Sequence, residues 1–237
     1  MVSVLISDGA VNALEALGAA QAVIEYLGTA AFAISAALLA GRRRMTVVGV
    51  VVFSVIVATG GGTIRDILLG DLPVYWVADP RPLLVAAVAA GVTIALVEIG
   101  SVSLLRRYNL VRLFDAAGLA LFTIVGTNIA LETGADALAA IVVGIITGVG
   151  GGMIRDTIAG RIPEVLASGH MYATAALTGS VLNVLLLSYT DLAPTLASST
   201  SVAAIFGLRL LAARYGGGVP QFSSADESAA PDTDERA

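Results

Sequence analysis

Two copies of one short motif contain the residues best suited to pair with ions. Residues 60–66 read Gly-Gly-Gly-Thr-Ile-Arg-Asp, and residues 150–156 repeat this pattern 90 positions later with six of seven residues identical. Each copy joins three flexible glycines to an arginine and an aspartate, which can form ion pairs or contact a charged solute. The motif therefore indicates ion pairing and solute binding.

The composition argues against covalent and redox chemistry. The chain has no cysteine and a single histidine, so neither a thiolate metal site nor a histidine cluster can be formed. We also find no combination of nucleophile and base typical of an enzyme. We therefore expect no enzyme activity, metal, cofactor or nucleic-acid partner.

Apolar residues dominate the chain and predict helices that cross a membrane. The chain is 57% hydrophobic and 13% charged, with a mean hydropathy of +0.90, whereas about 25% of residues are charged in a typical soluble domain. Apolar runs of about 20 residues, the length needed to cross a bilayer, recur as far as residue 213. The sequence predicts an all-α integral membrane protein with seven transmembrane helices, near residues 22–40, 46–69, 82–100, 112–130, 137–159, 171–189 and 194–213.

The arginines predict the orientation of these helices. They gather after the first, third, fifth and seventh predicted spans, whereas most acidic residues lie on the opposite side and Arg81 is the main exception. Short loops rich in arginine usually remain in the cytoplasm. We expect a multi-pass protein of the cell membrane, with its N-terminus outside and its C-terminus in the cytoplasm.

The duplicated motif belongs to a longer internal repeat. The same shift places Gly28 on Gly118, and Glu25 on the equally acidic Asp115. The repeats cover residues 22–100 and 112–189, with a seventh helix at 194–213, an extracellular segment at 1–21 and a disordered acidic tail at 214–237. Because each repeat has three spans, the second must enter the membrane from the opposite side, as in many transporters.

The glycine triplets have two interpretations. Three glycines cost about 2–3 kcal/mol of helix propensity, which suggests that the second and fifth spans are broken or kinked and that their free backbone lines a path. The preceding carbonyls would then suit a cation and the following amides a carboxylate, so the motif does not separate these ligands. Alternatively, the glycines let two helices pack closely.

Several residues are candidates for lining or closing the path. The charged residues of the motif either flank its two ends, or hold it closed through ion pairs, or simply clamp the helix ends. Asn128 and Asn183 are the best polar candidates within the other spans, because an amide is harder to satisfy locally than a hydroxyl. The predicted pore or substrate-binding residues are Gly60, Gly61, Gly62, Thr63, Arg65, Asp66, Gly150, Gly151, Gly152, Arg155, Asp156, Asn128 and Asn183.

Four segments resemble the prokaryotic trimeric intracellular cation (TRIC) channel family, which is also named glycine-transporter-like. They are YLGTAAFAISAALLAG, GGGTIRDILLGDLPVYW, DAAGLALFTIVGTNIAL and GGGMIRDTIAGRIPEVL. The resemblance covers residues 22–213 and implies a homotrimer of seven-helix subunits, each with its own pore bent at the two glycine triplets. Animal members carry a basic residue on span four, but residues 113–130 contain none here, so their form of voltage and lipid control is not expected.

The resemblance and the repeat together predict membrane transport. The first hypothesis is a homotrimeric channel for monovalent cations, chiefly potassium, with membrane lipid around the trimer. The alternative is a secondary transporter for glycine or another small neutral amino acid. An acidic residue at the membrane midplane, able to couple ions to transport, would favour the transporter; no charge lies clearly at any midplane, which favours the channel.

Overall fold

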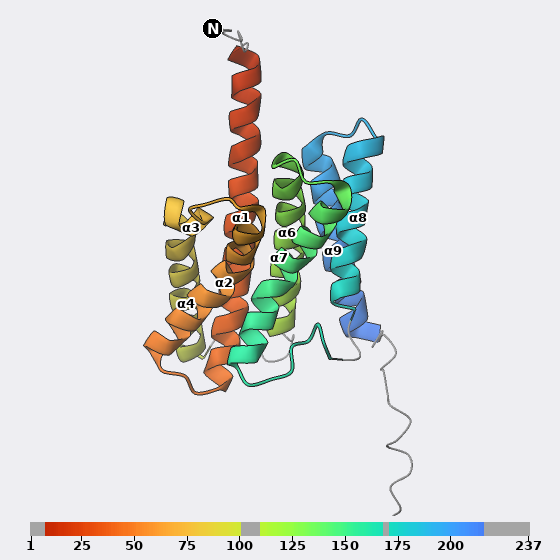
Figure 1. Ribbon diagram of the computed structural model, residues 1–237. Coiled ribbons are helices and arrows are strands. Elements are labelled where there is room, and N and C mark those ends of the chain that lie inside the picture. The colour runs from red at the N-terminus through yellow and green to blue at the C-terminus, as the bar shows by residue number, and fades with distance from the viewer. Residues whose placement is uncertain (1–7, 101–109, 168–170, 216–237) are drawn as a thin grey trace, which may run out of the picture.

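The described part of the chain is built from α-helices alone. The computed structural model describes residues 8–100, 110–167 and 171–215 (Figure 1). Its helices are α1 (Asp8–Arg42), α2 (Val47–Leu69), α3 (Tyr75–Ala78), α4 (Arg81–Glu98), α6 (Leu110–Glu132), α7 (Ala137–Ile158), α8 (Ala173–Tyr189) and α9 (Pro194–Tyr215).

These helices confirm the predicted all-helical membrane fold. Six helices are long and apolar enough to cross a membrane, and α8, with 17 residues, is a shorter apolar helix at the position of the sixth predicted span. The first helix starts at Asp8, well before its membrane-spanning part at Gln21–Gly41. The tail predicted at 214–237 lies outside the described residues, apart from the last two residues of α9.

The two repeats begin and end their central helices in the same way. Thr46 and Asp136, which are 90 residues apart, cap α2 and α7 by accepting hydrogen bonds from backbone amides at 3.1 and 2.8 Å. After these helices, Gly70 and Gly160 adopt positive φ angles of 70° and 65°, a conformation in which glycine avoids a steric penalty. The local sequence signals therefore produce matching helix boundaries.

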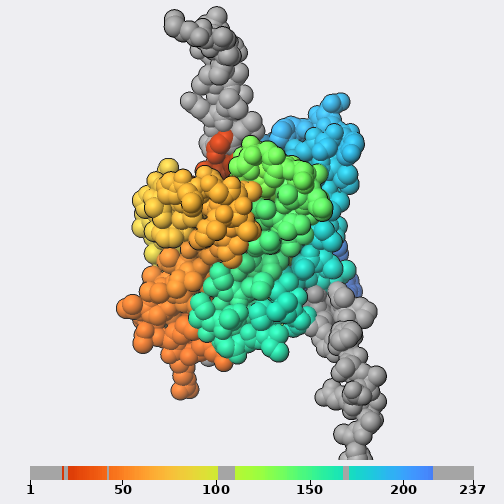
Figure 2. Space-filling view, viewed as in Figure 1, coloured from red at the N-terminus to blue at the C-terminus, as the bar shows by residue number. Residues whose placement is uncertain are grey.

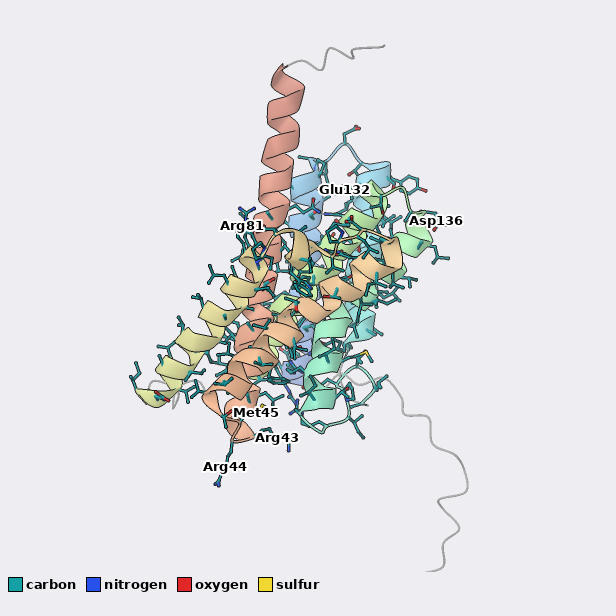
Figure 3. All side chains as sticks on the ribbon, turned by 60° about the vertical axis from the view of Figure 1, so that its left-hand side comes forward. Arg43, Arg44, Met45, Arg81, Glu132 and Asp136 are labelled. Atoms are coloured by element: carbon teal, nitrogen blue, oxygen red, sulfur yellow. The ribbon has the colours of Figure 1, made fainter. Side chains whose placement is uncertain are left out.

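The repeats run through the bundle in opposite directions. Figure 3 labels Arg43, Arg44 and Met45, which precede α2, at one end of the bundle, and Glu132 and Asp136, which precede α7, at the other. An odd number of spans in each repeat requires this inversion. The ends of α2 and α7 therefore lie at opposite ends of the molecule.

Four helices form the centre of the bundle. α1, α2, α6 and α7 pack against one another, α4 adds to α1 and α2, and α8 and α9 add to α6 and α7. In Figure 2, α7 lies between the orange surface of α2 and the blue surface of the C-terminal helices. The rings of Phe32 and Phe122, equivalent residues of the two repeats, stack at 5.6 Å between α1 and α6.

Candidate functional site: a glycine crossing between two charge clusters

The two glycine triplets lie where α2 and α7 cross. Both helices are continuous through their glycines, so the interpretation of broken spans with free amides is wrong. A Cβ atom added to Gly61 would collide with the carbonyl oxygen of Thr147, and one added to Gly150 would lie 3.2 Å from the Cα of Gly61. The glycines therefore allow the two backbones to touch, and this close contact offsets their poor helix propensity.

The crossing has internal two-fold symmetry. Gly61 faces the Thr147 carbonyl, and its equivalent Gly151 faces the Val57 carbonyl, 3.0 Å from the position of an added Cβ. Thr147 and Val57 are themselves 90 residues apart. Two backbone carbonyl oxygens thus lie at the helix contact, one from each repeat.

The outer glycines of the triplets accommodate neighbouring side chains. Gly60 lies against Ile154, and an added Cβ on Gly62 would approach the Tyr75 ring to 2.6 Å. The equivalent Gly152 lies against the Tyr172 hydroxyl. Five of the six predicted glycines are buried and one is half-buried, so the set lies together and closed to solvent. The buried glycines are Gly61, Gly62, Gly150, Gly151 and Gly152, and the half-buried one is Gly60.

The first charge cluster consists of Glu25, Arg65 and Asp66. The Arg65 guanidinium pairs with Glu25 at 2.9 Å and with Asp66 at 2.7 Å. Asp66 also accepts a hydrogen bond from the Tyr75 backbone amide at 2.8 Å, and the Arg65 guanidinium lies 5.2 Å from the centre of the Tyr75 ring. Arg65 and Asp66 are almost fully buried. The cluster therefore fastens α1, α2 and α3 together.

The second charge cluster consists of Asp115, Arg155, Asp156 and Arg209. Arg155 pairs with Asp115 at 2.7 Å and with Asp156 at 2.9 Å, which repeats the pattern of the first cluster. Arg209, from α9, adds a contact of 3.3 Å to Asp115. All four side chains are buried. Because Arg65 and Arg155 lie near the ends of oppositely directed helices, the two clusters occupy opposite ends of the bundle.

Hydroxyl groups complete the second cluster. Tyr172 donates a hydrogen bond to Asp115 at 3.0 Å, and Arg155 donates one to Ser35 at 2.9 Å. Ser35 lies on α1 and in turn donates to the carbonyl of Val111 at 3.0 Å. The second cluster therefore joins helices from both repeats, whereas an unpaired charge at this depth would cost several kcal/mol.

Asn128 and Asn183 lie together in the second repeat. Asn183 donates a hydrogen bond to the Asn128 side chain at 2.7 Å, and Asn128 donates one to Ser198 of α9 at 3.0 Å. Their hydrogen bonds thus connect α6, α8 and α9 rather than the two crossing helices. Thr63 is also engaged locally, since it donates to the Thr59 carbonyl at 2.9 Å and accepts from the Trp76 indole at 2.8 Å.

The two repeats bury hydroxyl residues at different positions. Thr123, Thr127 and Thr147 are buried where a shift of 90 residues places Ala33, Ala37 and Val57. The hydroxyls of Thr127 and Ser180 are hydrogen-bonded at 2.6 Å. The reverse also occurs, since Thr29, Ser35 and Thr59 are buried where the second repeat has Leu119, Val125 and Val149. The two halves therefore share a backbone plan but place their buried hydroxyls at different positions.

Two cavities lie along α1, α6 and α9, away from the crossing. One has a volume of about 350 Å³ and apolar walls that include Ala117, Leu121 and Phe206. The other, of about 200 Å³, is lined partly by Asn128 and Ser198. The predicted asparagine thus borders a cavity, whereas the glycine crossing is closed.

Sequence reasoning did not identify several residues of the site. Glu25 and Asp115 were matched as repeat equivalents, but their pairing with the motif arginines was not predicted. Tyr75, Tyr172 and Arg209 were also missed. The only signal for Arg209 was an arginine within an apolar span. Burial raises the pKa of the Tyr75 phenol, so this hydroxyl stays protonated at physiological pH.

Sequence comparison identifies a family. A family model described as "Glycine transporter" matches residues 22–98 and 112–188, the two repeats. The UPF0126 inner membrane protein YadS of Escherichia coli K12 is 41% identical over 200 residues, which cover 84% of this chain and 95% of that protein. A UPF0126 membrane protein of Vibrio cholerae is 40% identical over 210 residues, covering 85% of this chain and 82% of the relative.

Structural comparison identifies the same fold in solved channels. The TRIC trimeric intracellular cation channel orthologue from Rhodobacter sphaeroides matches with a TM-score of 0.77 and 34% identity, covering 83% of this chain and 98% of that one. A prokaryotic TRIC channel solved in 0.5 M KCl matches with a TM-score of 0.75 and 28% identity, covering 82% and 96%. These relatives are channels, so the prediction of a non-enzymatic membrane protein is confirmed. The chain therefore belongs to the glycine transporter family, also called UPF0126, and its subunit has the fold of the prokaryotic TRIC channels.

Proposed function

We propose that this chain is one subunit of a homotrimeric potassium channel with a conduction path inside each subunit. The path would run through the centre of α1, α2, α6 and α7, from the first charge cluster to the second, and pass the glycine crossing. The similarity to a trimeric intracellular cation channel orthologue of Rhodobacter sphaeroides supports this assignment. So does the placement of the motif residues at and around one crossing.

The two backbone carbonyl oxygens at the crossing are the observation that favours a cation as the transported solute. Val57 and Thr147 each present a carbonyl oxygen to a glycine of the facing helix. A helical carbonyl keeps a second lone pair after its helix hydrogen bond, and rings of such oxygens coordinate potassium in channels. The backbone amides of the motif donate hydrogen bonds within the continuous helices, so they are not free to bind the carboxylate of an amino acid.

The observed arrangement supports a closed state of the proposed channel. The glycines touch, the two phenylalanine rings stack beside them, and an ion cluster fills each end. Opening would require α2 and α7 to separate at Gly61 and Gly151, and the arginines to exchange at least one carboxylate for water. The ion pairs of Arg65 and Arg155 would thus stabilise the closed state.

We further propose an orientation in the inner, or cytoplasmic, membrane of a bacterium. The E. coli relative is described as an inner membrane protein. Arg43 and Arg44 lie at the end of the bundle that contains the second cluster, and Glu132 and Asp136 lie at the other. The positive-inside rule then places the second cluster on the cytoplasmic side and the N-terminus outside.

The competing function is transport of glycine or another small neutral amino acid. The family is described as glycine transporters, which favours this function. In addition, the hydrogen-bonded pair Asn128 and Asn183 lies beside a cavity and could hold a small polar solute. A transporter would have to alternate its access, and it would not pass current as single unitary steps.

The two functions differ in a planar bilayer. We would record currents from the purified protein in asymmetric potassium chloride, with and without glycine, and measure glycine uptake into matched liposomes. Unitary currents that reverse near the potassium equilibrium potential support the channel. Electrical silence together with saturable glycine uptake would refute it and favour the transporter.

A further inference from the structure

Arg209 breaks the symmetry between the two charge clusters. It lies on α9, outside the two repeats, yet its guanidinium is 3.3 Å from Asp115 and 3.2 Å from Glu164. The same group stacks on the Tyr172 ring at 4.3 Å and is only 4% exposed. Among the described residues, the ion pairs of the first cluster involve one arginine, Arg65.

The two clusters consequently differ by one unit of formal charge. The first holds two carboxylates and one guanidinium, Glu25, Asp66 and Arg65, and is negative by one. Their repeat equivalents, Asp115, Asp156 and Arg155, would make the second cluster negative by one as well. Arg209 neutralises it.

Neighbouring charges do not reverse this difference. Beyond the first cluster, Asp79 and Arg81 pair with each other at 2.8 Å. Beside the second, Glu164 also pairs with Arg112 at 3.5 Å, and Arg161 pairs with Asp156 at 2.8 Å. These three partly exposed groups add one further positive charge to the second end. The second end is therefore the less negative of the two.

We propose that Arg209 makes cation conduction asymmetric, so that cations enter more readily from the side of the first cluster. The proposal rests on the channel function proposed above. A unit charge about 7 Å from a hydrated ion changes its energy by about RT, which corresponds to a local concentration changed about threefold. The current carried by cations entering at the first cluster should exceed the reverse current by up to about threefold.

The test measures the ratio of currents at opposite voltages in symmetric 0.1 M KCl. A Ser188→Cys background gives the chain a single cysteine, because the natural sequence has none. Ser188 is exposed at the end of α8 nearest the first cluster, so labelling with an impermeant thiol reagent reports which side that cluster faces. Each variant is compared with its own reverse current, which removes differences in protein amount.

The formal charges of the two ends predict how the current ratio changes in each variant. With Arg112, Arg161 and Glu164 counted, the first end is negative by one and the second is positive by one. Arg209→Gln makes the second end neutral and Glu25→Gln makes the first end neutral, so either change should halve the charge difference and lower the ratio towards one. The double variant makes both ends neutral and should bring the ratio close to one. Arg209→Lys keeps the charge and should keep the wild-type ratio, as should Arg214→Gln, which removes an exposed arginine from the same helix.

Other outcomes overturn the inference. An unchanged ratio in both Arg209→Gln and Glu25→Gln, or an equal loss in Arg214→Gln, would refute a role for the buried charge. Raising the salt to 1 M, where the Debye length falls to about 3 Å, should also weaken rectification, and a salt-independent ratio would refute an electrostatic cause. Absence of potassium current in the wild type would instead refute the channel itself.

Discussion

Replacement of Gly61 by alanine should both destabilise the protein and impair transport. The added methyl group would collide with the Thr147 carbonyl, which is backbone and cannot rotate away. Overpacking of this kind typically costs about 1–3 kcal/mol, and alanine regains only about 1 kcal/mol of helix propensity. The helices must therefore move apart, which changes the contact that we assign to the conduction path.

The structure predicts an order among three alanine variants. Gly151→Ala should cost less than Gly61→Ala, because its new Cβ would lie 3.0 Å from the Val57 carbonyl and 3.1 Å from the Phe32 ring. Gly91→Ala on α4 is the matched control, since nothing lies within 4 Å of its added Cβ. It should be neutral, or stabilising by up to about 1 kcal/mol.

Thermal unfolding of the detergent-solubilised oligomer, combined with potassium flux into liposomes, tests this order. A cost of 1–3 kcal/mol corresponds to a melting temperature lowered by roughly 2–12 °C for a chain of this length. Gly61→Leu or Gly151→Leu should abolish flux while an oligomer can still be extracted. If Gly61→Ala matches Gly91→Ala in both melting temperature and flux, the close crossing is not the functional element that we infer.

Three further substitutions, two of them with a comparison variant, test the polar contacts by thermal unfolding against the wild type. Asp115→Asn leaves two buried arginines without their shared carboxylate and should cost about 3–5 kcal/mol; Glu25→Gln should cost less, because Arg65 keeps Asp66, and equal costs would contradict this account. Tyr172→Phe removes one hydrogen bond to a carboxylate, for an expected loss of about 1.5–3 kcal/mol, and a wild-type melting temperature would show that this bond contributes nothing. Asn128→Ala breaks two side-chain hydrogen bonds and should cost about 1–3 kcal/mol. Thr178→Val, at an exposed hydroxyl, is its control and should be close to neutral. A larger cost for Thr178→Val than for Asn128→Ala would refute the predicted importance of the asparagine pair.

The error about the glycine triplets has a physical cause. Helix propensity is a local quantity, and by that measure three glycines in a row predict an interruption. The structure instead places Gly61 and Gly150 against each other's helix, where the backbone contact favours the same residues for a non-local reason. Of the two interpretations of the triplets, close packing describes these helices, and the broken helix does not.

The pairing of the charges could not be derived from spacing. Glu25 lies 40 residues from Arg65, as Asp115 does from Arg155, and Asp115 lies 94 residues from Arg209. Asn128 and Asn183 are 55 residues apart. Such contacts depend on how the helices rotate and cross, and hydropathy alone does not specify either.

The sequence by itself determined that this chain is a helical membrane protein of two inverted repeats, and it located each span to within about two residues of the observed helix core. Hydropathy is a local signal and the match at 90 residues compares the chain with itself, so both can be read without a structure. Only the tertiary structure decided that the glycines lie at the contact between two continuous helices. It also decided that each motif arginine pairs with a carboxylate of a preceding helix, and that Arg209 contacts the second cluster and not the first. The ion pairs form because distant side chains must satisfy one another's charge once the membrane excludes water, whereas the glycine contact forms because two helix backbones pack closely.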